Sequence, residues 1–122
     1  MDEKLKDNIL YSKAYNYSLR VINVYKTLID EKKEFVLSKQ FLRCGTSIGA
    51  NIAEANGAIS KADFSSKISI SYKESLENKY WLSLLKDSGY ISDEEFRLMF
   101  ELVDELSRIM FSILKKTRIN NL

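Results

Sequence analysis

The 122-residue chain has no histidine, no proline, a single cysteine and only four glycines. Without histidine it lacks the commonest general base and metal ligand, which excludes Ser-His and Cys-His nucleophile pairs. Cys44 alone can form neither an intrachain disulfide nor a zinc site, and we expect it near the core as a small hydrophobe. Gly45 and Gly49 have neither the spacing nor the lysine of a phosphate-binding loop. The sequence therefore predicts a protein that is not an enzyme and holds no cofactor or metal.

Long apolar runs are also missing, so we expect no membrane-spanning segment. The first residues, MDEKLKDN, are polar and acidic and lack the apolar core of a secretory signal. Together with the single cysteine, this favours a cytoplasmic protein. Apolar residues make up 45% of the chain and charged residues 30%. These proportions and the length indicate one globular domain over residues 1–122.

What the chain has instead is helical periodicity. The absence of proline and the scarcity of glycine predict long helices joined by short loops. We expect helices over about residues 7–32, 38–58, 60–88 and from 92 onward. Because short connections make neighbouring helices antiparallel, the predicted fold class is all-α, an up-down-up-down antiparallel four-helix bundle.

Local signals mark the ends of these helices. Ser38 is expected to cap the second helix, and Ser60 and Ser92 each open a capping-box pattern before the third and fourth helices. Gly57 and Gly89 are stop signals at the ends of the second and third helices. The residues expected to face the core from the third helix are Phe64, Ile68, Leu76, Leu82 and Leu85.

A ribbon of polar residues runs along one face of the second helix, at steps of four, four and three residues. Two carboxylates of the third helix should lie opposite this ribbon. We predict that the two sets form a buried polar network that fixes helix register or a subunit contact. The predicted network consists of Arg43, Ser47, Asn51, Glu54, Glu74 and Glu77. The alternative interpretation gives the carboxylates acid-base or Mg²⁺ chemistry, although no nucleophile accompanies them.

The third helix interrupts its apolar stripe with Ser71, Ser75 and Asn78. A monomeric bundle gains little from burying small polar residues, whereas a helix of another copy can approach them closely. We therefore expect these residues at an interface between copies, so that the chain forms a homo-oligomer through its second and third helices.

Positive charge is modest, with a formal net charge of +2, and the stretch after Glu105 holds no acidic residue. Basic residues in this last stretch complement the helix dipole or contact phosphate, and the sequence leaves both interpretations open. Tyr11 and Tyr15 share a helix face and could stack on bases, or they could be core or interface residues. The candidate nucleic-acid contacts are Lys32, Lys33, Lys39, Lys115, Lys116 and Arg118.

Two motifs in order carry a resemblance to a known family. The first begins at Arg43, continues through Ser-Ile and Asn-Ile-Ala-Glu, and ends at Glu54. The second begins at Glu74, continues through Tyr-Trp-Leu, and ends with the Gly-Tyr-Ile turn at Ile91. Over roughly residues 41–92 the chain resembles the small bacterial four-helix-bundle proteins first noticed as open reading frames in intervening sequences of 23S ribosomal RNA genes. The resemblance implies an up-down bundle that assembles as a ring-shaped homopentamer.

The chain is also similar to the accessory subunit of diversity-generating retroelements, which partners a reverse transcriptase and binds nucleic acid through a basic surface. That similarity implies nucleic-acid binding, and a fivefold ring would multiply each basic residue into a ring of charge. We therefore expect a non-enzymatic homo-oligomer associated with RNA or DNA. The alternative is a protein-interaction scaffold, without nucleic acid, whose exposed aromatic side chains dock a protein partner.

Overall fold

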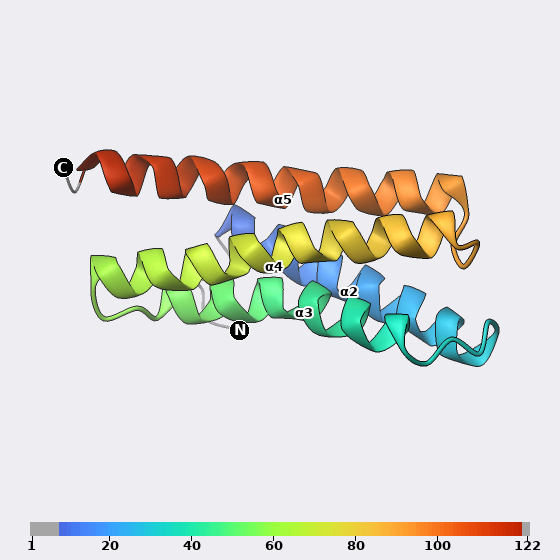
Figure 1. Cartoon of the computed structure of the whole chain (residues 1–122). Coiled ribbons are helices and arrows are strands. Elements are labelled where there is room, and N and C mark those ends of the chain that lie inside the picture. Colours follow the sequence, from blue (N-terminus) through green and yellow to red (C-terminus); the bar gives the residue numbers. More distant parts are fainter. Residues whose placement is uncertain (1–7, 121–122) are drawn as a thin grey trace.

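The computed structural model describes residues 8–120, with side chains placed through Thr117. These residues form four long helices joined by short connections (Figure 1). In chain order the helices are α2 (Ile9–Asp30), α3 (Leu37–Asn56), α4 (Lys61–Asp87) and α5 (Asp93–Asn120). Each connection is short and turns the chain back, so successive helices run antiparallel (Figure 1). For residues 8–120, the prediction of an all-α fold with four helices is confirmed.

The helices enclose one apolar core. α3 packs against both α2 and α4, α4 packs also against α5, and the contact between α2 and α5 is the sparsest of these. Burying a side chain the size of leucine or isoleucine stabilises a fold by about 1.5–3 kcal/mol. The buried apolar side chains therefore supply the main driving force for folding. Leu76, predicted to face the core, is instead 43% exposed. The largest fully buried side chains are Tyr17, Phe41, Leu28, Ile48, Ile52, Ile68, Leu82, Leu85, Met99, Leu106, Met110 and Val21.

Capping groups set the helix ends close to where the sequence predicts them. The Ser60 hydroxyl accepts the backbone N–H of Asp63 at 3.0 Å at the start of α4. The Ser92 hydroxyl accepts that of Glu95 at 3.1 Å at the start of α5. Gly89, after the end of α4, has a φ of 84°, a left-handed conformation that costs glycine little. These three predictions are confirmed.

The start of α3 differs from the prediction that Ser38 caps it. The buried carboxylate of Glu34 accepts the backbone N–H groups of Val36, Leu37 and Ser38 at 3.1, 2.9 and 2.7 Å. The Ser38 hydroxyl instead donates to the Glu34 carbonyl oxygen at 2.7 Å. Burial by itself raises the pKa of Glu34, but the three amide hydrogen bonds hold this pKa below its usual value. A carboxylate thus satisfies the free N–H groups and complements the dipole at this helix start.

Ser71, Ser75 and Asn78 are fully buried within the chain's own core, so the prediction that they lie at an interface between copies is wrong. The Ser71 hydroxyl donates to the backbone carbonyl of Ile48 at 2.8 Å, which ties α4 to α3. The hydroxyls of Ser75 and Ser107 lie 2.8 Å apart and tie α4 to α5. Because these groups find partners inside the bundle, their burial does not require a second copy.

Asn78 connects three helices. Its side-chain oxygen accepts the Tyr17 hydroxyl of α2, and its nitrogen donates to the Phe41 carbonyl and the Cys44 sulfur of α3, each at 3.4 Å. Burial raises the pKa of Tyr17 well above its ordinary value, so the phenol stays protonated and keeps its donor. The amide therefore fixes how α2, α3 and α4 meet.

Gly45 allows this close approach. A Cβ atom at Gly45 would lie 2.8 Å from both methyl groups of Val21 and 3.0 Å from the side-chain nitrogen of Asn78. Since real Cβ contacts are longer than this, any larger residue would push α2 and α4 away from α3. The glycine is therefore required by packing.

Candidate functional site

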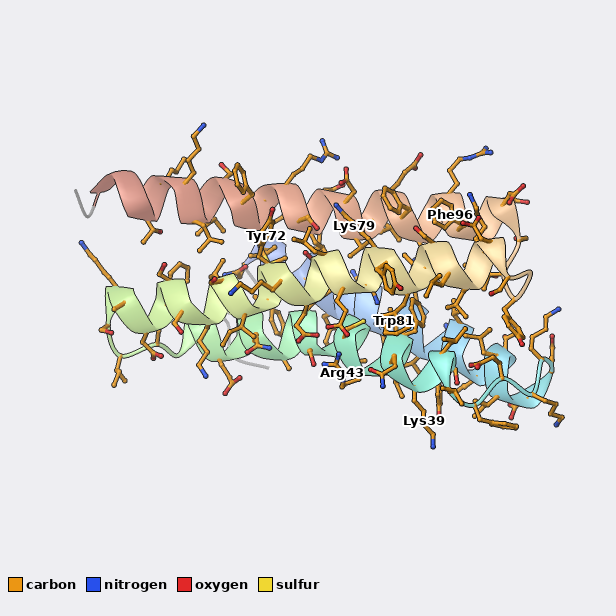
Figure 2. The ribbon with its side chains drawn as sticks, viewed as in Figure 1. Lys39, Arg43, Tyr72, Lys79, Trp81 and Phe96 are labelled. Carbon is orange, nitrogen blue, oxygen red and sulfur yellow. The ribbon has the colours of Figure 1, made fainter. Side chains whose placement is uncertain are left out.

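Arg43 on α3 bridges two carboxylates of α4 (Figure 2). Its Nη1 lies 3.2 Å from Glu74 Oε2 and its Nη2 lies 2.6 Å from Glu77 Oε1. The indole N–H of Trp81 donates to the same Glu77 oxygen at 3.1 Å. The Trp81 hydrogen bond and the Arg43 guanidinium hold the pKa of Glu77 below its ordinary value. The structure thus brings together three of the six predicted network residues.

This cluster lies on the surface of the single chain and not in its core. The side chain of Arg43 is 49% exposed and that of Glu77 is 36% exposed. Solvent screens ion pairs of this kind, which contribute about 0–1 kcal/mol each. The cluster therefore ties α3 to α4 at one point, and its role in a contact between copies stays a prediction.

The other three predicted network residues lie apart from Arg43. The Asn51 side chain donates to the backbone carbonyl of Ser47 at 2.9 Å, a bond within α3. The exposed Glu54 lies 3.6 Å from the Lys67 ammonium of α4. Glu54 is eleven residues beyond Arg43, about 16 Å along a helix, and so it cannot reach the same carboxylates. The periodicity of the sequence places these residues on one face of α3. It does not bring them together, because they are spread along the axis of the helix.

Within residues 8–120 there is no group of three or more acidic or cysteine side chains that could hold a metal ion. Cys44 is fully buried, as predicted, and burial raises the pKa of its thiol to about 11, which keeps it protonated at neutral pH. None of the helices described between residues 8 and 120 is long and apolar enough to cross a membrane.

The predicted nucleic-acid contacts fall at opposite ends of the bundle (Figure 1). At the α2–α3 connection, the exposed residues are Lys32, Lys33 and Lys39. Near the end of α5, Lys115 and Lys116 are exposed, and the side chain of Arg118 lies outside the described side chains. Since α5 has 28 residues, these ends are separated by roughly 40 Å. One chain therefore cannot gather all six residues into one patch.

A groove between α4 and α5, which we call the α4–α5 crease, was not predicted from the sequence. Within it, Lys79 and Arg108 both pair with Asp104, at 2.7 and 3.1 Å. Phe111 is 54% exposed beside them. The crease is lined by Tyr72, Leu76, Lys79, Asp104, Ser107, Arg108 and Phe111.

Comparison with known proteins adds the family. The family model described as 23S rRNA-intervening sequence protein matches residues 6–112. A crystal structure of a protein of unknown function from the S23 ribosomal protein family of Bacteroides thetaiotaomicron is similar, with 45% sequence identity and a TM-score of 0.87. The similarity covers 88% of this chain and 99% of that chain. Comparison with curated proteins gave no match. The chain therefore belongs to the 23S rRNA-intervening sequence protein family.

Proposed function

We propose that this protein is a non-enzymatic, cytoplasmic homo-oligomer that associates with RNA or DNA through the C-terminal part of α5. The observation that carries the proposal is the exposed pair Lys115 and Lys116, in a stretch that holds no acidic residue after Glu105. No carboxylate of the same stretch therefore offsets this charge. The connection between α3 and α4 lies at the same end of the bundle and adds the exposed Lys61 (Figure 1).

The resemblance described above supports assembly as a ring-shaped homopentamer. Such a ring would repeat the Lys115–Lys116 pair on every copy, so a modest charge per chain would give a strong local field. The buried positions of Ser71, Ser75 and Asn78 exclude them from the contact between copies. The surface cluster around Arg43 remains available for that contact. Light scattering should give the mass of a pentamer of 14.2-kDa chains.

Binding across a salt series tests the nucleic-acid proposal. Fluorescence anisotropy with labelled single-stranded RNA and duplex DNA should show micromolar or tighter binding that weakens linearly in log salt. The double variant Lys115→Glu/Lys116→Glu should lose at least about tenfold in affinity and flatten the salt slope, because each lost phosphate contact reduces that slope by roughly 0.7–0.9. The matched control is Lys32→Glu/Lys33→Glu, the same charge change at the opposite end of the bundle.

Three outcomes decide this proposal. Equal loss in both double variants would mean that only net charge matters and would count against a site at the end of α5. Unchanged binding in the Lys115→Glu/Lys116→Glu protein would contradict the proposed site and would mean that these lysines only complement the helix dipole. No binding even at low salt would remove nucleic acid from the proposal.

A protein-interaction scaffold is the second candidate, and exposed apolar side chains of α2 favour it. Ile9, Tyr15 and Leu19 are all exposed on this helix. A partner that covers them would bury apolar surface, and its affinity would change little with salt. Insensitivity to salt in a captured complex therefore distinguishes a protein partner from a nucleic acid.

A further inference from the structure

One pair of aromatic rings lies in the α4–α5 crease, and a second pair lies outside it on α5. The rings of Tyr72 and Phe111 have centroids 5.9 Å apart and are tilted by 39°. Further along α5, the rings of Phe96 and Phe100 have centroids 5.3 Å apart. Since Phe111 is 54% exposed, part of its ring faces solvent and can receive another flat group.

Two lysines of α4 lie over aromatic rings of α5. The Lys79 ammonium lies 5.6 Å from the centre of the Phe100 ring, and the Lys86 ammonium lies 4.4 Å from that of Phe96. Figure 2 shows Tyr72, Lys79 and Phe96 in turn along the line where α4 meets α5. These three side chains therefore follow one line along the contact between the two helices.

The rim of the crease carries more positive than negative charge. Arg108 is exposed and lies 3.1 Å from Asp104, and Lys115 is exposed one helical turn beyond Phe111. Asp104 also pairs with Lys79, whose hydrogen bond is the main reason that the pKa of Asp104 is lowered. Among the residues that line the crease, this carboxylate offsets one of the two cations, Lys79 and Arg108, and leaves one net positive charge.

We infer that the α4–α5 crease binds single-stranded nucleic acid, with bases stacked on Phe111 and Tyr72 and phosphates held by Lys79, Arg108 and Lys115. This inference rests on the proposed function and specifies its ligand class and site. A single strand presents flat bases beside phosphates, which match the Tyr72–Phe111 ring pair beside the cations Lys79 and Arg108. A duplex keeps its base faces stacked inside the helix and cannot use the aromatic groups. An acidic peptide would match the cations but would leave the stacking surfaces unused.

The variant Phe111→Leu tests the stacking contact. It keeps an apolar side chain at an exposed position and removes the flat ring, so the bundle should remain folded. Anisotropy with single-stranded RNA and DNA of about 12 nucleotides should show roughly a tenfold loss of affinity, the effect expected for one base–aromatic stack. Binding of a duplex of the same length should not change. The matched control is Tyr15→Leu, which removes a half-exposed ring from α2 and should leave binding unchanged.

The substitution Asp104→Asn gives a second test with the opposite sign. It removes the carboxylate charge from the crease and leaves Lys79 and Arg108 free to meet phosphate. Affinity for the single strand should rise about threefold or more at low salt. The control Glu105→Gln makes the same charge change one residue away, where the carboxylate pairs with Lys13 of α2, outside the crease. Equal tightening in both variants would overturn the site.

The outcomes separate this inference from the proposed function. If the wild-type protein binds nucleic acid but Phe111→Leu binds the single strand equally well, the crease is not the site and the proposed function stands. If the wild-type protein binds no nucleic acid, both fail. If light scattering shows that Phe111→Leu dissociates an oligomer, the crease is a contact between copies, and the inference is overturned.

Discussion

α4 carries polar side chains both on the side that faces the core and on the side that faces solvent, and the two sets differ in charge. On the side that faces the core, Ser71, Ser75 and Asn78 are uncharged and fully buried, and each bonds to a group of the same chain. On the side that reaches the surface, the polar groups are charged, as in the Arg43–Glu77 pair. Burying a charge costs several kcal/mol even when it is paired, whereas a hydroxyl or amide with a partner costs little. At these positions of α4 the buried groups are therefore neutral and hydrogen-bonded, and the charged groups lie at the surface.

The largest effect should come from the buried side. Asn78→Ala removes the acceptor of the Tyr17 hydroxyl and leaves a cavity where three helices meet. We expect a loss of about 3 kcal/mol in the free energy of unfolding, measured by urea denaturation. The control Lys73→Ala, at an exposed position of the same helix, should change stability by less than about 0.5 kcal/mol. Similar losses in the two variants would contradict the difference between the two sides.

A smaller effect is expected on the surface side, at Glu77. The substitution Glu77→Gln keeps the shape and removes the charge that faces Arg43, so about 0.5 kcal/mol should be lost at neutral pH because solvent screens the pair. The folded state lowers the pKa of Glu77 from its ordinary 4.5, through the Trp81 hydrogen bond and Arg43. The wild-type pair therefore contributes fully above that ordinary value, and its contribution is lost as the pH falls through the lower, folded value.

Denaturation curves at neutral and acidic pH check this sign. The stability difference between wild type and Glu77→Gln should shrink toward zero at acidic pH. A difference that stays constant with pH would show that the carboxylate charge does not stabilise the pair.

The smallest stability effect should come from Phe111→Leu. Since this ring is more than half exposed and lies over Tyr72, its replacement should change the free energy of unfolding by no more than about 0.5 kcal/mol. Thermal denaturation followed by circular dichroism measures this directly. A loss above about 1.5 kcal/mol would mean that Phe111 belongs to the core.

The fold was largely predictable where its signals are local. Ser60, Ser92 and Gly89 act on backbone groups within a few residues, so their roles can be inferred from adjacent sequence. The start of α3 was mispredicted because Glu34 and Ser38 are both suitable capping residues. Only the loop conformation decides which of the two oxygens meets the free N–H groups.

The buried polar groups were harder to interpret. Periodicity placed Ser71 and Asn78 on the inward face of α4, which is correct, but their partners Ile48 and Tyr17 are 23 and 61 residues away in sequence. Without those partners the same pattern indicated a contact between copies. Whether a buried amide is satisfied within its own chain depends on long-range packing, which spacing alone does not encode.

The candidate sites show the same limit. The Arg43–Glu74–Glu77 contact could be predicted because Arg and Glu face each other across two adjacent helices. Glu54 could not be separated from that contact, since its height along α3 relative to α4 is set by packing. The α4–α5 crease combines residues of two helices that are each unremarkable alone, so it became visible only when the helices were placed together.

Cys44, the chain's sole thiol, has a practical consequence. It is fully buried beside the Asn78 amide and is protonated at neutral pH. The thiol can therefore ionise and react with a thiol reagent only when the helices separate. The rate at which such a reagent modifies the native protein therefore reports how often the core opens. Cys44 is thus a built-in probe of local opening at the point where α2, α3 and α4 meet.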